Sequence, residues 1–384
     1  MEREKILVIT TTNFRNESRV LKECISLKKD GNNVTIVALH EEPLKEFEKV
    51  GTTQVHRIKL KSRSWPKHLL FQLLKYIEFI YKVVKLYAKN KHVVHCHDFS
   101  SLPIGMVIKK MYNKNIKIVY DAHEYETEIN GLKGGRKKLT KIVEKKLIKY
   151  VDKVITVSDS IANEYVRLYA IDKPAVVLNT PPFVIFINKT DVFRNTFNIA
   201  NEQIIFLYQG GLDHDRGIEI ILDAFIKLSN KTHPLNGKAA MVFMGYGPLE
   251  DLVYKAAHKY DNIYFHPAVP PDVLLNYTGS ADFGILFYEN TCLNHYYCSP
   301  NKIFEYVMAE LPVIVSDLYE MKRFVSQNKI GCVSKENTSD GLITAIGEVM
   351  NMNYQELKNN VKNLKTVYNW EEQEKILLNI YKEL

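Results

Sequence analysis

The stretch SPNKIFEYVMAELPVIVS, residues 299–316, joins the start of a helix to a short apolar run that is typical of a buried strand. Ser299 can cap the helix, and Pro300 can occupy its first position, where the missing backbone N–H is not needed. The same alternation of helical patterns and short apolar runs continues on both sides of this stretch. Such alternation predicts parallel sheets with helices on both faces.

The apolar runs form two series along the 384 residues, and each series predicts one sheet. The first comprises KILVIT, VTIVAL, QVHRIKL, HVVHCH, IKIVYD, KVITVS and AVVLN, and the second comprises IIFLYQ, AAMVFMG, NIYFH, DFGILF, PVIVS and IGCVS. Residues 179–203 hold two prolines and then many polar side chains, which is typical of a domain boundary. We therefore expect an α/β fold with two Rossmann-like, doubly wound parallel-sheet domains, residues 1–185 and 186–368, that face a cleft.

The composition is that of an ordinary globular protein, with 46% hydrophobic and 25% charged residues. No run of 18 or more uncharged apolar residues occurs, and the first residues, MEREKILVIT, lack the apolar core of a signal peptide. The five cysteines are scattered without a CxxC pair, so we expect reduced thiols and neither a disulfide nor a zinc framework. These features predict a cytoplasmic protein.

The charge is distributed unevenly along the chain. Residues 1–185 contain 34 Lys and Arg against 20 Asp and Glu, a net charge of +14, whereas the remainder has a net charge of −6. Between Arg57 and Lys91, ten basic residues accompany a single acid, Glu78, and an apolar stripe recurs at helical spacing. The stripe comprises Leu69, Leu70, Leu73, Leu74, Ile77, Ile80, Tyr81 and Val84, with Lys67, Lys75, Lys82 and Lys85 largely outside it. The segment predicts a basic amphipathic helix.

This helix has two interpretations. It can be a core helix with a solvated lysine face, or it can bind an anionic lipid surface, and the density of positive charge slightly favours the second. Nucleic acid is a weaker candidate, because the basic segments lack interleaved aromatic residues and match no nucleic-acid motif. We therefore expect an anionic membrane surface as a partner, and no nucleic acid.

Polar side chains follow three strands of the first half, at the sheet edge where doubly wound folds bind ligands. After the first strand, a group of polar residues can hold a phosphate or a carboxylate, or can simply cap and solvate the next helix: Asn13, Arg15, Asn16 and Arg19. Two further sets follow VVHCH and IKIVYD, and we expect them to form one polar wall of the cleft unless they are ordinary loop residues. They are His97 and Asp98 in one set and Asp121, His123 and Glu124 in the other.

His95 and His97 point to the same side of an extended strand, and such a pair can bind a metal. No further histidine or cysteine stands nearby at ligand spacing, so we predict no metal and expect His95 to be buried and hydrogen-bonded. His97 is better placed to meet a substrate as a hydrogen-bond donor or proton carrier. The Asp-His-Asp triplet at residues 213–215 is equally weak evidence for a metal.

Glycines and a basic residue follow the first two strands of the second half. Gly210 and Gly211 permit a close backbone approach, and Arg216 can fork onto a phosphate at the turn into the next helix. Gly245 follows the second strand, where a tight turn is enough to explain it. No GxGxxG motif follows any strand, so a dinucleotide-binding dehydrogenase loses its main support.

The opening stretch supplies the remaining groups of this half. At its helix start, the free N–H groups and the positive end of the helix dipole favour an anion, and Lys302 adds a full positive charge. Glu305 lies on the same helix face one turn later, where a carboxylate suits the vicinal hydroxyls of a ribose. The combination predicts a site for a nucleoside diphosphate.

In the order of these motifs the chain resembles the retaining glycosyltransferases of family 4, which have the GT-B fold, and especially those of bacterial surface-polysaccharide assembly. The resemblance covers nearly the whole chain, with HCHDFSSLPIG and YDAHE in the first half and FMGYGPLE and SPNKIFEYVMAELPVIVSD in the second. It implies that the second domain binds a nucleotide-sugar donor, UDP- or GDP-linked, and that the first binds a lipid-linked or polysaccharide-precursor acceptor. Residues 369–384 are similar to the terminal helix that crosses back to the first domain.

The resemblance also implies roles for single residues. Glu305 matches the family glutamate that holds the ribose, Arg216 matches the basic residue near the diphosphate, and His97 matches the histidine beside the transferred sugar. The chain departs from the family at Tyr297, where many members have a first glutamate, and at Gly211, where they have an arginine. The expected donor contacts also include Gly210, Gly211, Gly245, Pro267, Ser299, Asn301 and Lys302, and those on the acceptor side are Asn13, Arg15, His123 and Glu124.

The family implies hexosyl-type transfer with retention at the anomeric carbon, without a metal or other cofactor. The expected catalytic residues are His97, Asp98, Arg216 and Lys302. A nucleotide-sugar epimerase of the same fold and a non-catalytic nucleotide-sugar-binding protein remain alternatives, as does a structural protein that uses only the basic helix. The basic first half favours a lipid-linked acceptor at the inner face of the cell membrane.

Overall fold

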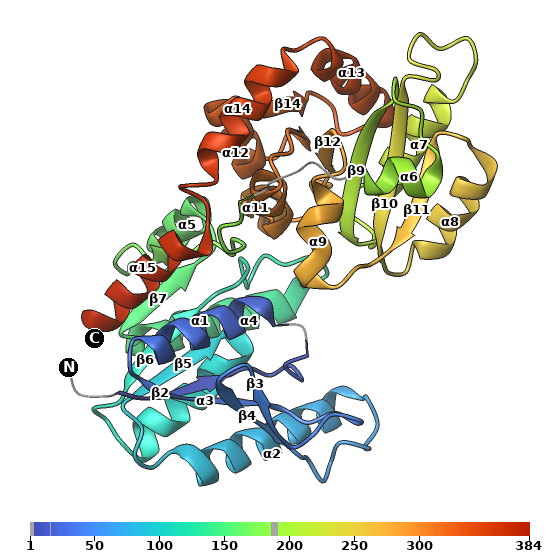
Figure 1. The fold of residues 1–384 in the computed structure, drawn as a ribbon. Helices are drawn as coiled ribbons and strands as arrows, with labels where there is room; N and C mark the ends of the chain where they lie inside the picture. Colours follow the sequence, from blue (N-terminus) through green and yellow to red (C-terminus); the bar gives the residue numbers. More distant parts are fainter. Residues whose placement is uncertain (1–3, 16, 186–190) are drawn as a thin grey trace. The chain divides into compact units, whose positions relative to one another are not determined.

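The computed structural model describes residues 4–15, 17–185 and 191–384, which form two compact α/β units (Figure 1). Residues 1–177 and 374–384 belong to the first unit, and residues 178–373 belong to the second. The division falls after Val177 rather than after residue 185 as expected, and the chain rejoins the first unit after Gln373, within its last helix.

The first unit is built on an eight-stranded sheet of order β3-β4-β2-β1-β5-β6-β7-β8. Its strands are β1 (Lys5–Ile9), β2 (Asn33–Leu39), β3 (Phe47–Val50), β4 (Thr53–Ile58), β5 (Val93–His97), β6 (Lys117–Asp121), β7 (Lys153–Thr156) and β8 (Ala175–Val176). Its helices are α1 (Ser18–Lys29), α2 (Leu69–Tyr87), α3 (Asp98–Met111), α4 (Gly134–Leu147), the 3-10 turn η1 (Ile148–Tyr150), α5 (Asp159–Tyr169) and the last part of α15 (Trp370–Lys382). Figure 1 shows α1 on one face of this sheet and α2 with α3 on the other.

One strand pair of this sheet departs from the parallel prediction. β3 pairs with β4 in antiparallel fashion, with Val50 opposite Thr53. Gly51 and Thr52 thus form a two-residue turn, in which Gly51 has a φ of +57°. The sequence did not reveal β3, because its four residues lie at the sheet edge and are exposed or half-buried rather than apolar.

The second unit has a six-stranded, wholly parallel sheet of order β11-β10-β9-β12-β13-β14. Its strands are β9 (Ile204–Gly211), β10 (Ala239–Tyr246), β11 (Ile263–Pro267), β12 (Phe283–Leu286), β13 (Val313–Ser316) and β14 (Gly331–Ser334). Its helices are α6 (Val192–Phe197), α7 (Ile218–Leu228), α8 (Glu250–Lys259), α9 (Pro271–Thr278), α10 (Leu293–Tyr297), α11 (Asn301–Met308), α12 (Tyr319–Asn328), α13 (Ser339–Met350), α14 (Tyr354–Leu364) and the start of α15.

Two hydrophobic cores cover the two faces of the second sheet. Phe206 and Tyr208 of β9 enter one core, whereas Ile205 and Leu207 enter the other, because successive side chains of a strand point to opposite faces. A strand buried on both faces must be apolar at almost every position. Each apolar run that predicted a strand does lie on a strand, and the predicted α/β fold of two doubly wound units is confirmed.

Helix α2 presents its apolar stripe outward. Leu69, Leu70 and Leu73 are 73%, 58% and 53% exposed, whereas Phe79 and Val83 on another face of the helix are buried. Leu74, Ile77 and Tyr81 of the stripe are exposed too, whereas its Ile80 is half-buried and its Val84 is buried. Lys75, which was expected outside the core, is buried and donates a 2.7 Å hydrogen bond to the carbonyl oxygen of Trp65. The interpretation as a core helix with a solvated lysine face is therefore wrong for the six exposed residues of the stripe.

Candidate functional site

A pocket of about 300 Å³ opens in the second unit, beside the ends of β9 and β10 and the N-terminus of α11. The carboxyl ends of parallel strands are where doubly wound sheets bind ligands. Several residues predicted on the donor side line this pocket together. They are Gly210, Arg216, Gly245, Asn301, Lys302 and Glu305.

Two glycines let the backbone and Lys302 fill the space at the strand ends. Gly210 has a φ of +109°, and a Cβ atom there would lie 2.4 Å from Cε of Lys302. A Cβ atom on Gly245 would lie 1.9 Å from the carbonyl oxygen of Gly210 on the neighbouring strand. Gly245 lies within β10, so the tight turn suggested for it is wrong: the glycine is required by a close approach of two strands.

The cations of this pocket share one tyrosine hydroxyl. The Oη atom of Tyr288 accepts hydrogen bonds from Nη1 of Arg216 at 2.5 Å and from Nζ of Lys302 at 3.3 Å. Nζ of Lys302 also lies 5.5 Å from the centre of the Tyr208 ring. Tyrosine side chains, rather than carboxylates, therefore hold both cations in place.

Neither cation is well neutralised by an acidic residue. Lys302 is only 9% exposed, and no carboxylate in the described ranges lies within ion-pair distance of it. The nearest ion-pair contact of Arg216 is at the long distance of 3.8 Å, between its Nε atom and Oδ2 of Asp213. Burying a positive charge without a counter-ion is costly, so this pocket favours an anionic ligand.

Glu305 stands one turn after Lys302 on α11 and lines the same pocket. Its Oε2 atom accepts a 2.6 Å hydrogen bond from Nε2 of Gln209. The predicted order of a cation and then a carboxylate on one helix face is therefore present. Gln209 and Tyr288 are partners that sequence reasoning missed, because they reach α11 from distant parts of the chain.

The start of α11 differs from the prediction by one residue. The helix begins at Asn301, Pro300 takes the N-cap position with extended backbone angles (φ −62°, ψ 136°), and no side chain caps the helix. The prediction that Ser299 is the cap is therefore wrong. The proline ring fixes φ, but its ψ is extended here, so Pro300 precedes the helix instead of opening it.

Other residues predicted on the donor side lie outside the lining of this pocket. Gly211 and Ser299 are among them, and so is Pro267, although the two residues that follow it, Ala268 and Val269, do line the pocket. Tyr297 ends α10, and its ring packs against Tyr296 and Tyr319 at centroid distances of 5.0 and 5.9 Å.

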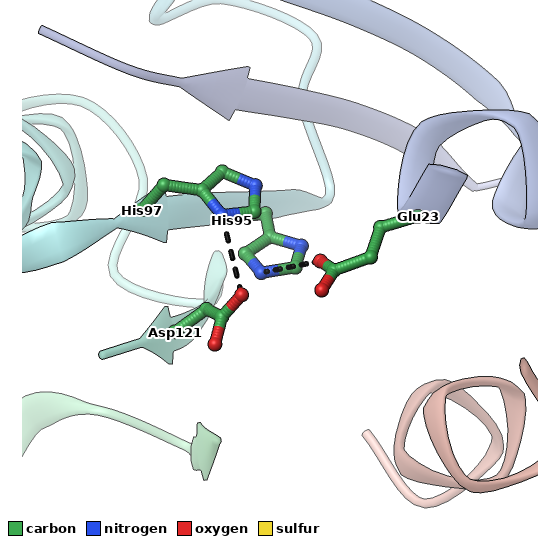
Figure 2. A group of neighbouring side chains, drawn as sticks. All are labelled: Glu23, His95, His97 and Asp121. Carbon is green, nitrogen blue, oxygen red and sulfur yellow. Dashed lines mark ion pairs between the residues drawn. The ribbon is translucent and has the colours of Figure 1, made fainter. Parts of the chain in front are cut away.

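The first unit holds a buried cluster of ionisable side chains at the ends of β5 and β6 (Figure 2). Nδ1 of His97 lies 3.3 Å from Asp121, and Nε2 of His95 lies 3.7 Å from Glu23 of α1. The two histidine rings stack with centroids 4.2 Å apart. The Tyr381 hydroxyl is 2.7 Å from Nδ1 of His95, so His95 is buried and hydrogen-bonded as expected.

These four clustered side chains place metal-ligating atoms within 4.8 Å of one another. Arg19, however, donates hydrogen bonds of 2.9 and 2.8 Å to the two oxygens of Asp121 and lies 3.1 Å from Glu23. Burial raises the pKa of Asp121, but Arg19 and His123 lower it by more, to well below its ordinary value. A divalent cation would have to displace this buried guanidinium, so the cluster fits a metal poorly.

His123 extends the cluster toward the surface. Its Nε2 atom lies 2.9 Å from Nδ1 of His97 and 3.1 Å from Asp121, and its Nδ1 atom lies 3.4 Å from Asp98. Burial lowers the pKa of both histidines, yet Asp121 and Asp98 raise that of His123 to about 9 while that of His97 stays below its ordinary value. At neutral pH His123 is therefore protonated and His97 is neutral.

The other residues predicted on the acceptor side occupy surface loops. Asn13 donates a 2.7 Å hydrogen bond to Glu41, and its Oδ1 atom accepts one of 3.0 Å from the backbone N–H of Arg15. Arg15 and Glu124 are exposed, Asn16 lies outside the described residues, and Arg19 is buried in its ion pair with Asp121. The local hydrogen bonds of Asn13 agree with the alternative in which this segment caps and solvates its own loop.

The raised pKa of His123 predicts a pH-dependent stability. An ordinary histidine has a pKa near 6.5, so the contribution of His123 is fully present below about pH 6.5 and is lost as the pH rises through about 9. We expect the difference in unfolding free energy between the wild type and His123→Gln to shrink by about 3 kcal/mol over this range. Urea unfolding at several pH values measures it, with exposed His258→Gln as the matched control. A difference that stays constant with pH would contradict the prediction.

Two domain families match the chain. Residues 17–181 match glycosyltransferase family 4, and residues 233–370 match the C-terminal domain of glucosyltransferase 3-like proteins. Over 375 residues the chain is 24% identical to an uncharacterized glycosyltransferase of Methanocaldococcus jannaschii, a match that spans 93% of this chain and 91% of that protein.

Solved structures share the fold over essentially the whole chain. Sucrose-phosphate synthase of Thermosynechococcus elongatus superposes with a TM-score of 0.78 at 16% identity, covering 99% of each chain. HepE of Anabaena, in complex with UDP and glucose, gives a TM-score of 0.74 at 13% identity and full coverage of both chains. At these identities the likeness concerns the fold.

The fold and the family matches together define a class. The chain has the GT-B fold, and the matches support a glycosyltransferase. Within that class its first unit is similar to family 4 and its second to the glucosyltransferase 3-like C-terminal domains.

Proposed function

We propose that the protein transfers a hexosyl group from a nucleoside-diphosphate sugar to a lipid-linked or polysaccharide-precursor acceptor, with retention of anomeric configuration. The observation that carries this proposal is the pocket of the second unit. There the buried Lys302 and the half-buried Arg216 lack a close carboxylate, and Glu305 stands one turn after Lys302. A diphosphate supplies the missing negative charge, and a ribose supplies hydroxyls for Glu305.

In this mechanism the bond between the anomeric carbon and the diphosphate oxygen breaks, and the leaving diphosphate gains negative charge. Arg216 and Lys302 stabilise that charge, which is the work that a metal does in other transferases. A phosphate oxygen accepts the proton of the attacking hydroxyl on the same face, so that configuration is retained. UDP is the first donor to try, because the related fold of HepE and a trehalose-6-phosphate protein of Escherichia coli were solved with UDP or UDP-sugars.

We assign the acceptor side to the first unit. His97 is neutral, and its Nε2 atom is buried without a hydrogen-bond partner in the described part of the chain, so a sugar hydroxyl that reaches it can satisfy this atom. Asp98 and protonated His123 lie next to it, and Glu124, Asn13 and Arg15 are the further candidates for contact.

The first test of this function is a thermal-shift panel of UDP, GDP and their sugars on the wild type and Glu305→Ala. A ligand at about one hundred times its Kd adds ~2.7 kcal/mol of stability, which is readily measured. A shift with one base that Glu305→Ala abolishes supports the donor site, and no shift with any nucleotide would refute it. Incubating the bound sugar nucleotide without acceptor then separates the alternatives, because an epimerase interconverts it whereas a binding protein leaves it unchanged with or without acceptor.

We further propose that α2 binds the protein to the anionic inner face of the cell membrane. No helix among the described residues is long and apolar enough to cross a bilayer. The outward stripe of α2 supplies apolar side chains, and its neighbours Lys67, Lys85 and Lys89 are exposed. Partial insertion of leucines and attraction of lysines to acidic lipids together favour such docking.

Replacing Leu70 and Leu73 with glutamate should lower binding to vesicles containing about 30% anionic lipid by at least about 10-fold, since both apolar area and charge complementarity are lost. Cosedimentation at increasing salt measures it, and the wild type should release from the vesicles as salt rises. Leu252→Glu with Tyr254→Glu, two exposed apolar positions of α8, is the matched control. Equal binding by both double variants, or binding that does not fall with salt, would argue against this surface.

A further inference from the structure

Two successive hydrogen bonds from buried side chains hold the carboxylate of Glu305 in place. Oγ1 of Thr278 donates a 2.7 Å hydrogen bond to Oε1 of Gln209, and Nε2 of Gln209 donates one of 2.6 Å to Oε2 of Glu305. Gln209 is 1% exposed and Thr278 is fully buried. Gln209 thus joins the C-terminal residue of α9 to the carboxylate that lines the pocket.

The chemistry of these groups fixes the orientation of the Gln209 amide. An ionised carboxylate only accepts hydrogen bonds, so the NH₂ group of Gln209 must face Glu305 and its oxygen must face Thr278. The Thr278 hydroxyl is then the donor, and it also lies 2.9 Å from the carbonyl oxygen of Leu274. The backbone N–H of Gln209 donates to the Tyr306 hydroxyl at 3.3 Å, which fixes the residue at both ends.

This arrangement leaves one oxygen of Glu305 for a ligand. Oε2 is engaged by Gln209, whereas no group in the described part of the chain donates a hydrogen bond to Oε1. Glu305 is only partly buried and faces the same pocket as Lys302 and Arg216. A carboxylate with one oxygen anchored has lost most of its rotational freedom, so it is already oriented when a ligand arrives.

We infer that Gln209, itself held by Thr278, is a positioning residue that presents Oε1 of Glu305 to the vicinal hydroxyls of a ribose, so that this pocket selects ribonucleotides over nucleotides that lack these hydroxyls. The inference rests on the proposed donor site. Gln209 itself lines the pocket, and it adds a source of specificity that acts through the carboxylate of Glu305.

The test compares two ligands on four proteins. Titration calorimetry gives the Kd of UDP, or of GDP if UDP does not bind, and of the matching 2′,3′-dideoxynucleoside diphosphate. The proteins are the wild type, Gln209→Met, Thr278→Val and Thr278→Ser. We expect the wild type to prefer the ribonucleotide by at least about 10-fold, as is typical of a hydrogen bond to a charged group.

We expect the variants to lose the preference for the ribonucleotide while they still bind the dideoxynucleotide. Gln209→Met should bind the dideoxy ligand as tightly as the wild type but should prefer the ribonucleotide by less than about 3-fold, since Glu305 is no longer anchored. Thr278→Val should lose part of the preference, and Thr278→Ser, which keeps the hydroxyl, should retain it. In turnover assays with a nucleotide sugar, Gln209→Met should raise KM more than it lowers kcat.

Each other outcome has a distinct meaning. If the wild type binds neither nucleoside diphosphate, the donor site itself is wrong. If the wild type binds both ligands equally, or if Gln209→Met keeps the full preference, the positioning role is overturned while the donor site stands. If Gln209→Met weakens both ligands to the same extent while its melting temperature is unchanged, the role is likewise overturned, because Gln209 then supports the pocket rather than the ribose contact.

Discussion

Lys302→Met is expected to weaken the binding of a nucleoside diphosphate by about 100-fold, because charge-assisted hydrogen bonds to the phosphates are lost. The same change should lower kcat by about 100-fold if Lys302 stabilises the charge of the leaving group as proposed. Without ligand, however, the variant should be as stable as the wild type or more stable. Methionine has a similar length, and it removes a buried charge that has no carboxylate partner.

Titration calorimetry, turnover assays and thermal unfolding of one preparation measure these three effects. Lys335→Met is the matched control, because Lys335 is 86% exposed and stands away from the residues that line the pocket. Unchanged affinity in Lys302→Met would remove the diphosphate from this pocket. A large fall in the stability of the free protein would instead show that the cation has a structural role.

Gly245→Ala should destabilise the second unit by about 3 kcal/mol or more. The added Cβ atom would lie 1.9 Å from the carbonyl oxygen of Gly210, so the two paired strands β9 and β10 would have to separate. Because both strands are buried on both faces, little room for relaxation exists. We also expect nucleotide binding to be lost, since the end of β10 forms part of the pocket.

Urea unfolding followed by circular dichroism measures this change. Gly347→Ala is the matched control, because no atom lies within 4 Å of the Cβ that it would add on the helix α13. That variant should be stabilised by up to about 1 kcal/mol, as alanine is a better helix former than glycine. Similar unfolding free energies for the wild type and Gly245→Ala would mean that the strands yield more easily than their spacing indicates.

The positions of the strands other than the edge strand β3 could be predicted, because burial leaves an apolar signal along most of each run. The pair Lys302 and Glu305 could also be predicted, since their spacing on one helix is a local property. Gln209 could not, because it meets Glu305 across a separation of 96 residues along the chain. The same holds for Tyr288, whose hydroxyl becomes relevant only when two cations are seen to share it.

The orientation of α2 shows a different limit of sequence reasoning. A stripe of leucines identifies an apolar face, but nothing in the stripe says whether protein or another surface covers it. Lys75 also misleads, because a buried lysine whose amine reaches the carbonyl oxygen of Trp65 has the same spacing as a solvated one. The sequence predicts that this helix forms, whereas its packing determines which face of the helix is exposed.

Arg216 and Lys302 both donate hydrogen bonds to the hydroxyl of Tyr288, and this shared partner has an evolutionary consequence. Losing this hydroxyl, as in Tyr288→Phe, would disturb both cations at once, so selection cannot tune them separately. Among descendants of this chain, the three positions should therefore be retained together or replaced together. A lineage that changes only one of them would be the first place to look for a pocket that binds a ligand other than the proposed diphosphate.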